Sequence, residues 1–315
     1  MDKNIIVTGA SGLVATELTH LLLSLNDNYK IYAVSTNPDK LKERYENCTD
    51  IKCLSLQDLE KYADTCFEAV IHCAFARSND AKQIASSLQF TENLLQIVRV
   101  LRPGVFVNIS SQSIYGQANP PLWKEDAPPA PDYLYALGKY STELLTSAYL
   151  DNSGIKYTNI RLSSVCENAR FLNIFAKNAL SGNPVNVLGG TQRCAFIDVR
   201  DVADALKTVI EQSITVKLRN IYNLGTGETR TILELAEDTK RIAKAELGLQ
   251  VAVNVQASEL RQEVGMDVSL FRETFGWSPC YGYDDMIRSL LALNGANFGG
   301  GVIPISFSVL YKRYI

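Results

Sequence analysis

Residues 4–15 read Asn-Ile-Ile-Val-Thr-Gly-Ala-Ser-Gly-Leu-Val-Ala, and residues 16–25 continue as a helix-forming run. The apolar residues before Gly9 predict a short buried strand, and the run from Thr16 predicts a helix. Gly9 and Gly12 lie in the turn between the two elements, where the lack of a side chain lets the backbone approach a bound group closely. The stretch therefore predicts the first strand, turn and helix of an open parallel α/β sheet.

The same turn predicts what the sheet binds. Free N–H groups at the start of a helix bind anions, so a pyrophosphate is favoured at this point. The spacing is Gly-x-x-Gly-x-x-Ala, and the methyl group of Ala15 still permits close packing of the helix on the strand. We expect contacts to a dinucleotide from Gly9, Ser11, Gly12, Leu13 and Val14.

The end of the second predicted strand, residues 30–34, bears on the choice of dinucleotide. A carboxylate at this position accepts hydrogen bonds from a ribose with two free hydroxyls. This chain has Ser35 and Thr36 there, and basic residues follow at positions 40, 42 and 44. Since no carboxylate would repel a 2′-phosphate, the sequence favours NADP and leaves NAD open.

A second stretch predicts chemistry at the same edge of the sheet. Residues 105–109, Val-Phe-Val-Asn-Ile, predict a strand buried on both faces, and Ser111 follows it closely. Ligands of open parallel sheets bind beyond the carboxyl ends of the strands, so this hydroxyl is expected in the site. Tyr135 and Lys139 come later, at a spacing that puts both on one face of a helix. An ammonium beside the phenol would lower its pKa from about 10 and make Tyr135 an acid/base.

These residues resemble a known family. The motif SSQSIYG at 110–116, followed by YALGK at 135–139, is similar to the Ser and Tyr-x-x-x-Lys signature of extended short-chain dehydrogenase/reductases, in particular the nucleotide-sugar epimerases and dehydratases. The resemblance runs from Ile5 to about Leu293. It implies that Ser111 orients the substrate oxygen, Tyr135 is the acid/base and Lys139 binds the cofactor. It also implies further cofactor contacts, from Ser35, Thr36, Ser55, Leu56, Cys73, Ala74, Phe75, Tyr135 and Leu162.

The resemblance also implies the fold class, a Rossmann-type doubly wound parallel sheet with a smaller α/β substrate-binding domain. Residues 1–166 and 194–226 would form the discontinuous dinucleotide-binding domain, and residues 167–193 and 227–294 the substrate-binding domain. No role is assigned to the tail at 295–315. Ser113, Arg193 and Arg261 are the expected substrate contacts, the two arginines because a planar guanidinium suits a diphosphate.

The residues after Ser111 restrict the reaction. The family's 4,6-dehydratases have an Asp-Glu pair there, whereas this chain has Gln112 and Ser113. Its 3,5-epimerases have a Cys at the position of Ser113. Redox at one carbon remains, and we favour a sugar 4-epimerase with a transient 4-keto intermediate. The alternatives are an NADPH-dependent nucleotide-4-keto-sugar reductase and a non-catalytic dinucleotide-binding sensor or scaffold.

Composition argues against several other classes. The net charge of −3 over 315 residues disfavours nucleic acid as a partner. Two histidines and seven cysteines without paired spacing predict no metal site and reduced thiols, hence a cytoplasmic location. No stretch has the ~20 apolar residues of a membrane span. A homodimer and a place in cell-surface polysaccharide biosynthesis are implied by the resemblance alone.

Overall fold

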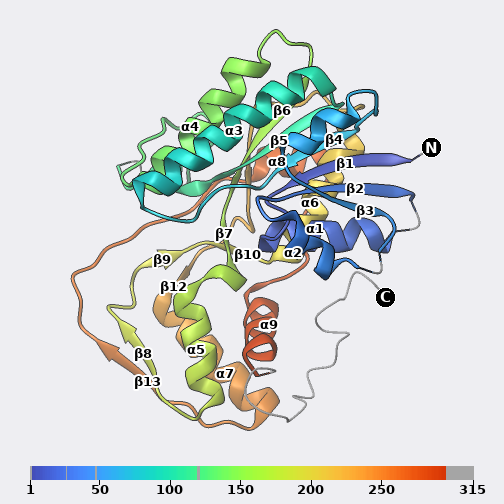
Figure 1. Ribbon diagram of the computed structural model, residues 1–315. Coiled ribbons are helices and arrows are strands. Elements are labelled where there is room, and N and C mark those ends of the chain that lie inside the picture. Colours follow the sequence, from blue (N-terminus) through green and yellow to red (C-terminus); the bar gives the residue numbers. More distant parts are fainter. Residues whose placement is uncertain (1, 26, 47, 119–120, 296–315) are drawn as a thin grey trace.

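The structure is a computed structural model that describes residues 2–25, 27–46, 48–118 and 121–295 (Figure 1). Apart from Gly295, the tail singled out at 295–315 lies outside the described residues.

Seven parallel strands form the central sheet, in the order β11-β6-β5-β4-β1-β2-β3. The strand order reverses between β1 and β4, as in doubly wound folds, and this confirms the predicted α/β class. The strands are β1 (Lys3–Thr8), β2 (Tyr29–Val34), β3 (Ile51–Leu54), β4 (Ala69–His72), β5 (Val105–Ser111), β6 (Lys156–Leu162) and β11 (Ile221–Leu224).

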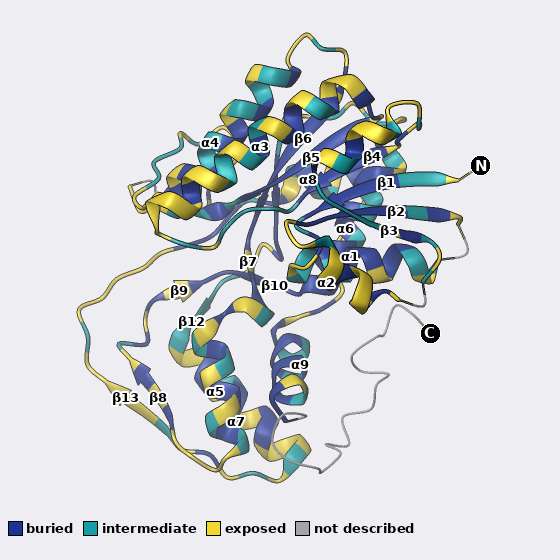
Figure 2. Cartoon of the chain, viewed as in Figure 1, coloured by how far each residue is buried: buried dark blue, intermediate teal, exposed yellow. Residues whose placement is uncertain are grey.

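Helices cover both faces of this sheet (Figure 1). Alternate side chains of β1 enter different cores, because successive residues of a strand point to opposite faces. Ile5 packs with the helices α1 and α6, whereas Ile6 packs with α3 and α4. Figure 2 shows the central strands as almost continuously buried. The helices around the sheet are α1 (Leu13–Ser24), α2 (Pro38–Arg44), α3 (Ala81–Leu101), α4 (Leu134–Leu150), α6 (Val199–Gln212) and α8 (Ser269–Phe275).

A second part of the chain has its own core, in which Phe175, Val187, Leu235 and Met286 are buried. Short strand pairs connect it to the main sheet. The domain boundaries given above stay a prediction. The elements of this part are α5 (Arg170–Leu180), β8 (Val185–Leu188), α7 (Ile232–Leu247), β13 (Val253–Gln256) and α9 (Tyr283–Gly295), and the short strands are β7 (Ser164–Val165), β9 (Arg193–Cys194), β10 (Phe196–Ile197) and β12 (Arg230–Thr231).

The first helix begins earlier than the sequence suggested. The run from Thr16 predicted its start, but α1 begins at Leu13 because Gly12 is its N-cap, with extended backbone (φ −77°, ψ 159°). The first helical hydrogen bond runs from Thr16 N to Gly12 O at 2.9 Å. The N–H groups of Leu13, Val14 and Ala15 therefore have no partner within the helix and point out of its first turn.

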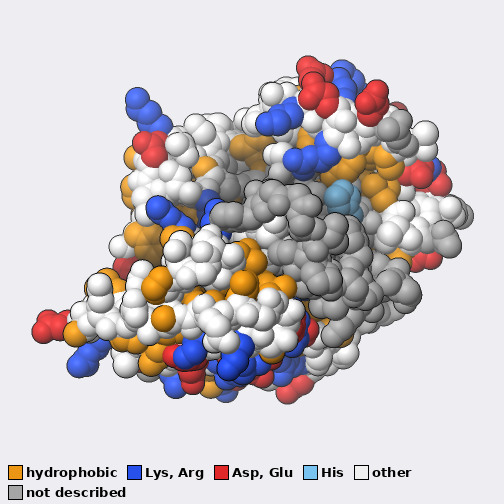
Figure 3. Space-filling model, turned by 90° about the horizontal axis from the view of Figure 1, so that it is seen from below, with side chains coloured by type: hydrophobic (Ala, Val, Ile, Leu, Met, Phe, Trp, Pro, Cys, Tyr) orange, Lys and Arg blue, Asp and Glu red, His pale blue; other side chains and the backbone are white. Residues whose placement is uncertain are grey.

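Within the described residues, no helix is long and apolar enough to cross a membrane. On the face shown in Figure 3, acidic and basic side chains are interspersed and do not form one large area of a single sign.

Candidate functional site

A cavity of about 880 Å³ lies beyond the carboxyl ends of β4 and β5, between the first turn of α1 and the segment at residues 261–264. This volume lies in the range of small-molecule sites, which measure roughly 300–1,000 Å³. The cavity brings together eleven residues that the sequence proposed for the site: Gly12, Leu13, Val14, Cys73, Phe75, Ser111, Ser113, Tyr135, Lys139, Leu162 and Arg261.

The other proposed residues do not line this cavity. Arg193 is exposed and donates a hydrogen bond from Nη1 to Thr229 Oγ1 at 2.9 Å. Ser55 donates from Oγ to Asp58 Oδ2 at 2.7 Å in the turn after β3. Their roles stay predictions, as do those of the remaining residues outside the cavity lining, which are Gly9, Ser11, Ser35, Thr36, Leu56 and Ala74.

The glycine turn fits the pyrophosphate of a dinucleotide. Gly9 has a φ of +64°, and a Cβ there would lie 2.7 Å from the Cα and N of Ala74, so the loop after β4 packs directly on the turn. Gly12 and the first residues of α1 line the cavity. The N–H of Gly12 donates to Gly9 O at 2.8 Å, so the N–H groups left at the helix start are those of Leu13, Val14 and Ala15. The first turn of α1 contains no acidic residue. These features suit the turn to bind an anion.

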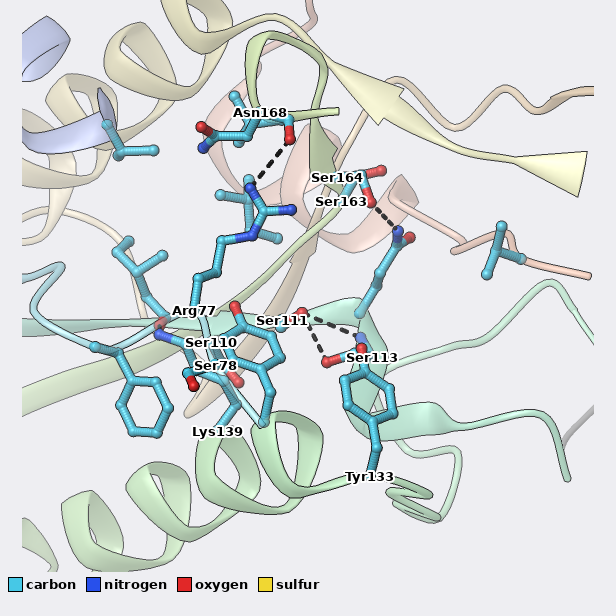
Figure 4. Close-up of a pocket in the computed structure, with 18 of the residues that line it drawn as sticks. Arg77, Ser78, Ser110, Ser111, Ser113, Tyr133, Lys139, Ser163, Ser164 and Asn168 are labelled. Carbon is cyan, nitrogen blue, oxygen red and sulfur yellow. Dashed lines mark hydrogen bonds between the residues drawn. The ribbon is translucent and has the colours of Figure 1, made fainter. Parts of the chain in front are cut away.

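Two serines form a short hydrogen-bond chain at the end of β5 (Figure 4). Ser111 Oγ accepts hydrogen bonds from Ser113 Oγ at 2.9 Å and from Ser113 N at 3.2 Å. The hydroxyl proton of Ser111 is thus free to be donated to the phenol of Tyr135. The hydrogen bond between Ser111 and Tyr135 lowers the pKa of Tyr135. Ser113 therefore orients the hydroxyl of Ser111.

Lys139 is buried, with 6% of its surface exposed. Its Nζ donates to Ile109 O at 2.7 Å and lies 4.6 Å from the centroid of the Phe75 ring. Burial lowers the pKa of Lys139 to about 8, while the nearby Cys73 and Glu143 act in the opposite direction. The side chain is thus mainly an ammonium at neutral pH and carries a lower pKa than a free lysine.

The charge that lowers the pKa of Tyr135 in this structure is not the expected ammonium of Lys139. Burial raises the pKa of Tyr135, and the charge that opposes this rise is the guanidinium of Arg77. Phe75 explains the difference, because its ring meets that of Tyr135 edge-on, with centroids 6.0 Å apart, and also receives the ammonium of Lys139.

The loop after β4 supplies two residues that the sequence reasoning missed. Arg77 lines the cavity and donates from Nη1 to Asn168 O at 3.3 Å (Figure 4). Asn79 Oδ1 accepts from Tyr135 N at 3.1 Å and so caps the first turn of α4. Neither residue belongs to a periodic pattern. The available signal was their position just after a strand whose carboxyl end faces the site.

A buried network of hydrogen bonds supports the end of β5 beside Ser111. Arg161 donates from Nε to Glu143 Oε1 at 3.1 Å and from Nη2 to Glu143 Oε2 at 2.9 Å. Ser110 Oγ donates to Glu143 Oε1 at 2.5 Å, next to Ser111. Arg161 Nη1 also donates to Tyr115 OH, which donates to Asn223 Oδ1 at 2.7 Å. The network therefore links β5, α4, β6 and β11.

Asn223 extends this network to two further segments. Its Nδ2 donates to Trp123 O at 2.9 Å and to Asp267 O at 3.0 Å. One amide side chain thus joins β11 to the loop before α4 and to the segment before α8.

His72 is a buried residue of β4 outside the cavity lining. Its ring nitrogens are hydrogen-bonded to Thr8 Oγ1 and Thr91 Oγ1, at 2.8 and 2.9 Å. Burial lowers the pKa of His72 to about 3, so the ring is neutral at physiological pH. In the part of the chain that the structure describes, no group of three or more His, Cys, Asp or Glu could hold a metal ion.

Comparison with known protein families shows which family this chain belongs to. The model of the NAD dependent epimerase/dehydratase family matches residues 5–225. The chain belongs to this family. It is an enzyme of the extended short-chain dehydrogenase/reductase type, as the Ser and Tyr-x-x-x-Lys motifs implied. Members that act on nucleotide sugars include epimerases, dehydratases and decarboxylases.

Three relatives illustrate the range of the family. An uncharacterised protein of Methanocaldococcus jannaschii is 27% identical over 264 residues, which are 75% of this chain and 80% of that protein. The dTDP-glucose 4,6-dehydratase of Streptomyces niveus is 27% identical over 246 residues, 73% of this chain and 70% of that enzyme. The crystal structure of UDP-glucuronic acid 4-epimerase from Bacillus cereus, in complex with UDP-glucuronic acid and NAD, has a TM-score of 0.76 at 21% identity. It covers 93% of this chain and 99% of its own, which shows the shared fold.

Proposed function

We propose that this family member is a nucleotide-sugar 4-epimerase that acts through a transient 4-keto sugar. The observation that carries the proposal is the meeting of Ser111, Tyr135 and Lys139 in one cavity with an anion-binding helix start. A nicotinamide dinucleotide bound at that helix start would accept and return the hydride.

The chain's own residues have separate tasks in this proposal. Tyr135 takes the proton of the sugar's C4 hydroxyl and later returns it to the C4 oxygen, when the hydride returns to the carbon. Ser111, oriented by Ser113, donates a hydrogen bond to the C4 oxygen of the sugar. Lys139, fixed on Ile109 O and Phe75, holds the cofactor ribose. Arg261 lines the cavity and binds a substrate phosphate; Arg193 would reach the diphosphate only by leaving Thr229.

The surroundings of Ser111 speak against dehydration. Gln112 Nε2 donates to Ser164 Oγ at 3.0 Å, and an amide exchanges no proton with a sugar. Among the described residues that line the cavity, Asp132 is the single carboxylate, and it comes from the segment before α4. Redox at one carbon needs no further acid or base beyond Tyr135.

A 4-keto-sugar reductase is the second candidate. Ser35 follows β2 without a carboxylate in the next two residues, so NADP is not repelled there, and a reductase would use NADPH as an exchangeable substrate. NAD is the cofactor in the B. cereus complex, and we propose NAD for the epimerase.

The test is turnover by the purified protein. An epimerase retains its dinucleotide through gel filtration and interconverts UDP-sugars that differ at C4 without added cofactor. A reductase consumes added NADPH only with a 4-keto sugar. We expect Tyr135→Phe to lower turnover at least ~100-fold, within the range of acid/base catalysis, with cofactor affinity nearly unchanged. Tyr133→Phe is the matched control, because its exposed ring stacks on Tyr135 with centroids 6.2 Å apart. Equal rates in the Tyr135→Phe variant and the wild type would remove Tyr135 from the mechanism.

A further inference from the structure

We propose that Arg77 is a positioning residue that faces the phenol of Tyr135 and promotes its ionisation, the role that the sequence pattern gives to Lys139. The inference rests on the proposed function, because it concerns the acid/base of that reaction. Arg77 lies in the loop after β4 and belongs to no motif recognised in the sequence.

The loop from Phe75 to Asn79 wraps around the start of α4. Phe75 packs on the edge of the Tyr135 ring, and Asn79 caps the backbone N–H of the same residue. Arg77 lies between these two contacts in sequence and lines the cavity that Tyr135 also lines. The loop is therefore fixed on Tyr135 on both sides of Arg77, and Arg77 and Tyr135 share one cavity.

The guanidinium is also held from the opposite side of the cavity. Arg77 Nη1 donates to Asn168 O, which belongs to the segment before α5 (Figure 4). This carbonyl orients the arginine without neutralising it. Arg77 forms no ion pair with a carboxylate in the part of the chain that is described, so its charge acts on the cavity.

The other groups around the phenol do not replace this charge. Lys139 is directed to Ile109 O and to the ring of Phe75. Ser111 donates a hydrogen bond and carries no charge, and Tyr133 opposes ionisation. The full set of titratable and charged side chains that line the cavity with Tyr135 is Arg77, Lys139 and Arg261, with Asp132, Tyr133 and Cys73.

The size of the effect follows from the exposure of Arg77. Arg77 is exposed, so water screens its charge and limits its effect on the phenol. We therefore expect Arg77→Gln to raise the pKa of Tyr135 by roughly 0.5–1 unit, which lowers the phenolate fraction about three- to tenfold below that pKa.

The experiment is an ultraviolet titration of the phenolate band without any sugar. The chain has 15 tyrosines, so each curve is corrected by the same variant carrying Tyr135→Phe, which isolates one ionisation. Arg77→Gln raises the midpoint of the Tyr135 titration, and Arg77→Lys returns the midpoint most of the way to the wild-type value. Arg261→Gln, which removes a charge from the same cavity, leaves the midpoint unchanged. Equal midpoints for the wild type and Arg77→Gln overturn the inference, as does an equal shift from Arg261→Gln.

Two further measurements keep the test independent of the proposed function. Added salt screens an exposed charge, so it raises the midpoint of the wild type and not that of Arg77→Gln. If the protein turns over sugars, the acid limb of its pH–rate profile moves up with the titration while the plateau stays the same. A titration shift without sugar turnover would uphold the role of Arg77 and reject the epimerase. Weaker dinucleotide binding without a titration shift would make Arg77 a cofactor contact and overturn the inference.

Discussion

Glu143 and Arg161 form a doubly hydrogen-bonded ion pair, with side chains 5% and 2% exposed, directly beneath the hydroxyls of Ser110 and Ser111. Glu143 also lies one helical turn beyond Lys139 and acts to raise its pKa. The same carboxylate thus serves the fold and the electrostatics of the site.

Removing one partner of this pair leaves a buried charge without compensation. We expect Glu143→Gln to lower the free energy of unfolding by about 3–5 kcal/mol, measured by urea denaturation. Lys207→Ala is the control, since it removes a partly exposed helical ion pair with Glu211 and costs less than about 1 kcal/mol. A loss for Glu143→Gln no larger than that of the control would contradict the role of the pair.

The stability of the protein depends on pH through Lys139. Because its folded pKa, about 8, lies below that of a free lysine, the unfolded chain binds more protons between pH 8 and 10.5. The native state therefore gains stability as pH rises through this window, by on the order of 3 kcal/mol. Lys139→Met lacks this gain, so the stability of the wild type relative to the variant increases from pH 8 to 10.5. Parallel stability curves for the two proteins would refute the prediction.

Glu167 gives a dependence of the opposite sign. Burial, followed by the charge of Asp198, raises the pKa of Glu167 to about 8, and its Oε2 is buried without a hydrogen-bond partner. Between the unfolded pKa near 4.5 and pH 8 the native state binds more protons than the unfolded chain, so stability falls as pH rises.

Glu167→Gln removes this loss, and thermal unfolding should show a gain in stability that is at least ~1 kcal/mol larger at pH 8 than at pH 5. The same substitution at Glu237, which pairs with Lys240 on the surface, is the control and should show no such difference. A gain of equal size at both pH values would mean that Glu167 is not protonated in the native state.

Gly9 and Gly182 allow steric crowding to be separated from backbone strain. Their φ angles are +64° and +68°, but a Cβ at Gly9 meets the backbone of Ala74 at 2.7 Å, whereas a Cβ at Gly182 meets nothing within 4 Å. Gly182→Ala should cost about 1 kcal/mol from strain alone. Gly9→Ala should cost more and should also weaken NAD binding, measured by calorimetry. Equal costs at both positions, with unchanged NAD affinity, would show that the close approach to Ala74 is unimportant.

The sequence predicts best what depends on neighbouring residues. The strand at 105–109 and the serines after it were recognisable because apolar composition and position in the chain determine both. The Tyr-x-x-x-Lys spacing likewise places Tyr135 and Lys139 on one face of α4, and both line the cavity.

The electrostatics of the pair were not predictable from this spacing. A shared helix face says nothing about Phe75, which comes from a loop 60 residues earlier and contacts both side chains. The charge that does act on Tyr135 comes from Arg77 in that same loop. Likewise, Arg193 was the first phosphate candidate and Arg261 the second, but Arg193 in the short strand β9 donates to Thr229, and Arg261 is the one that lines the cavity.

The three hydrogen bonds of the Asn223 side chain tie separate segments of the chain to one strand of the main sheet. They join β11 to Tyr115, Trp123 and Asp267, so these segments move as one unit with the main sheet. Arg77 and Asn168, by contrast, join two segments that line the cavity through a single exposed hydrogen bond, which is easier to break than the contacts of Asn223.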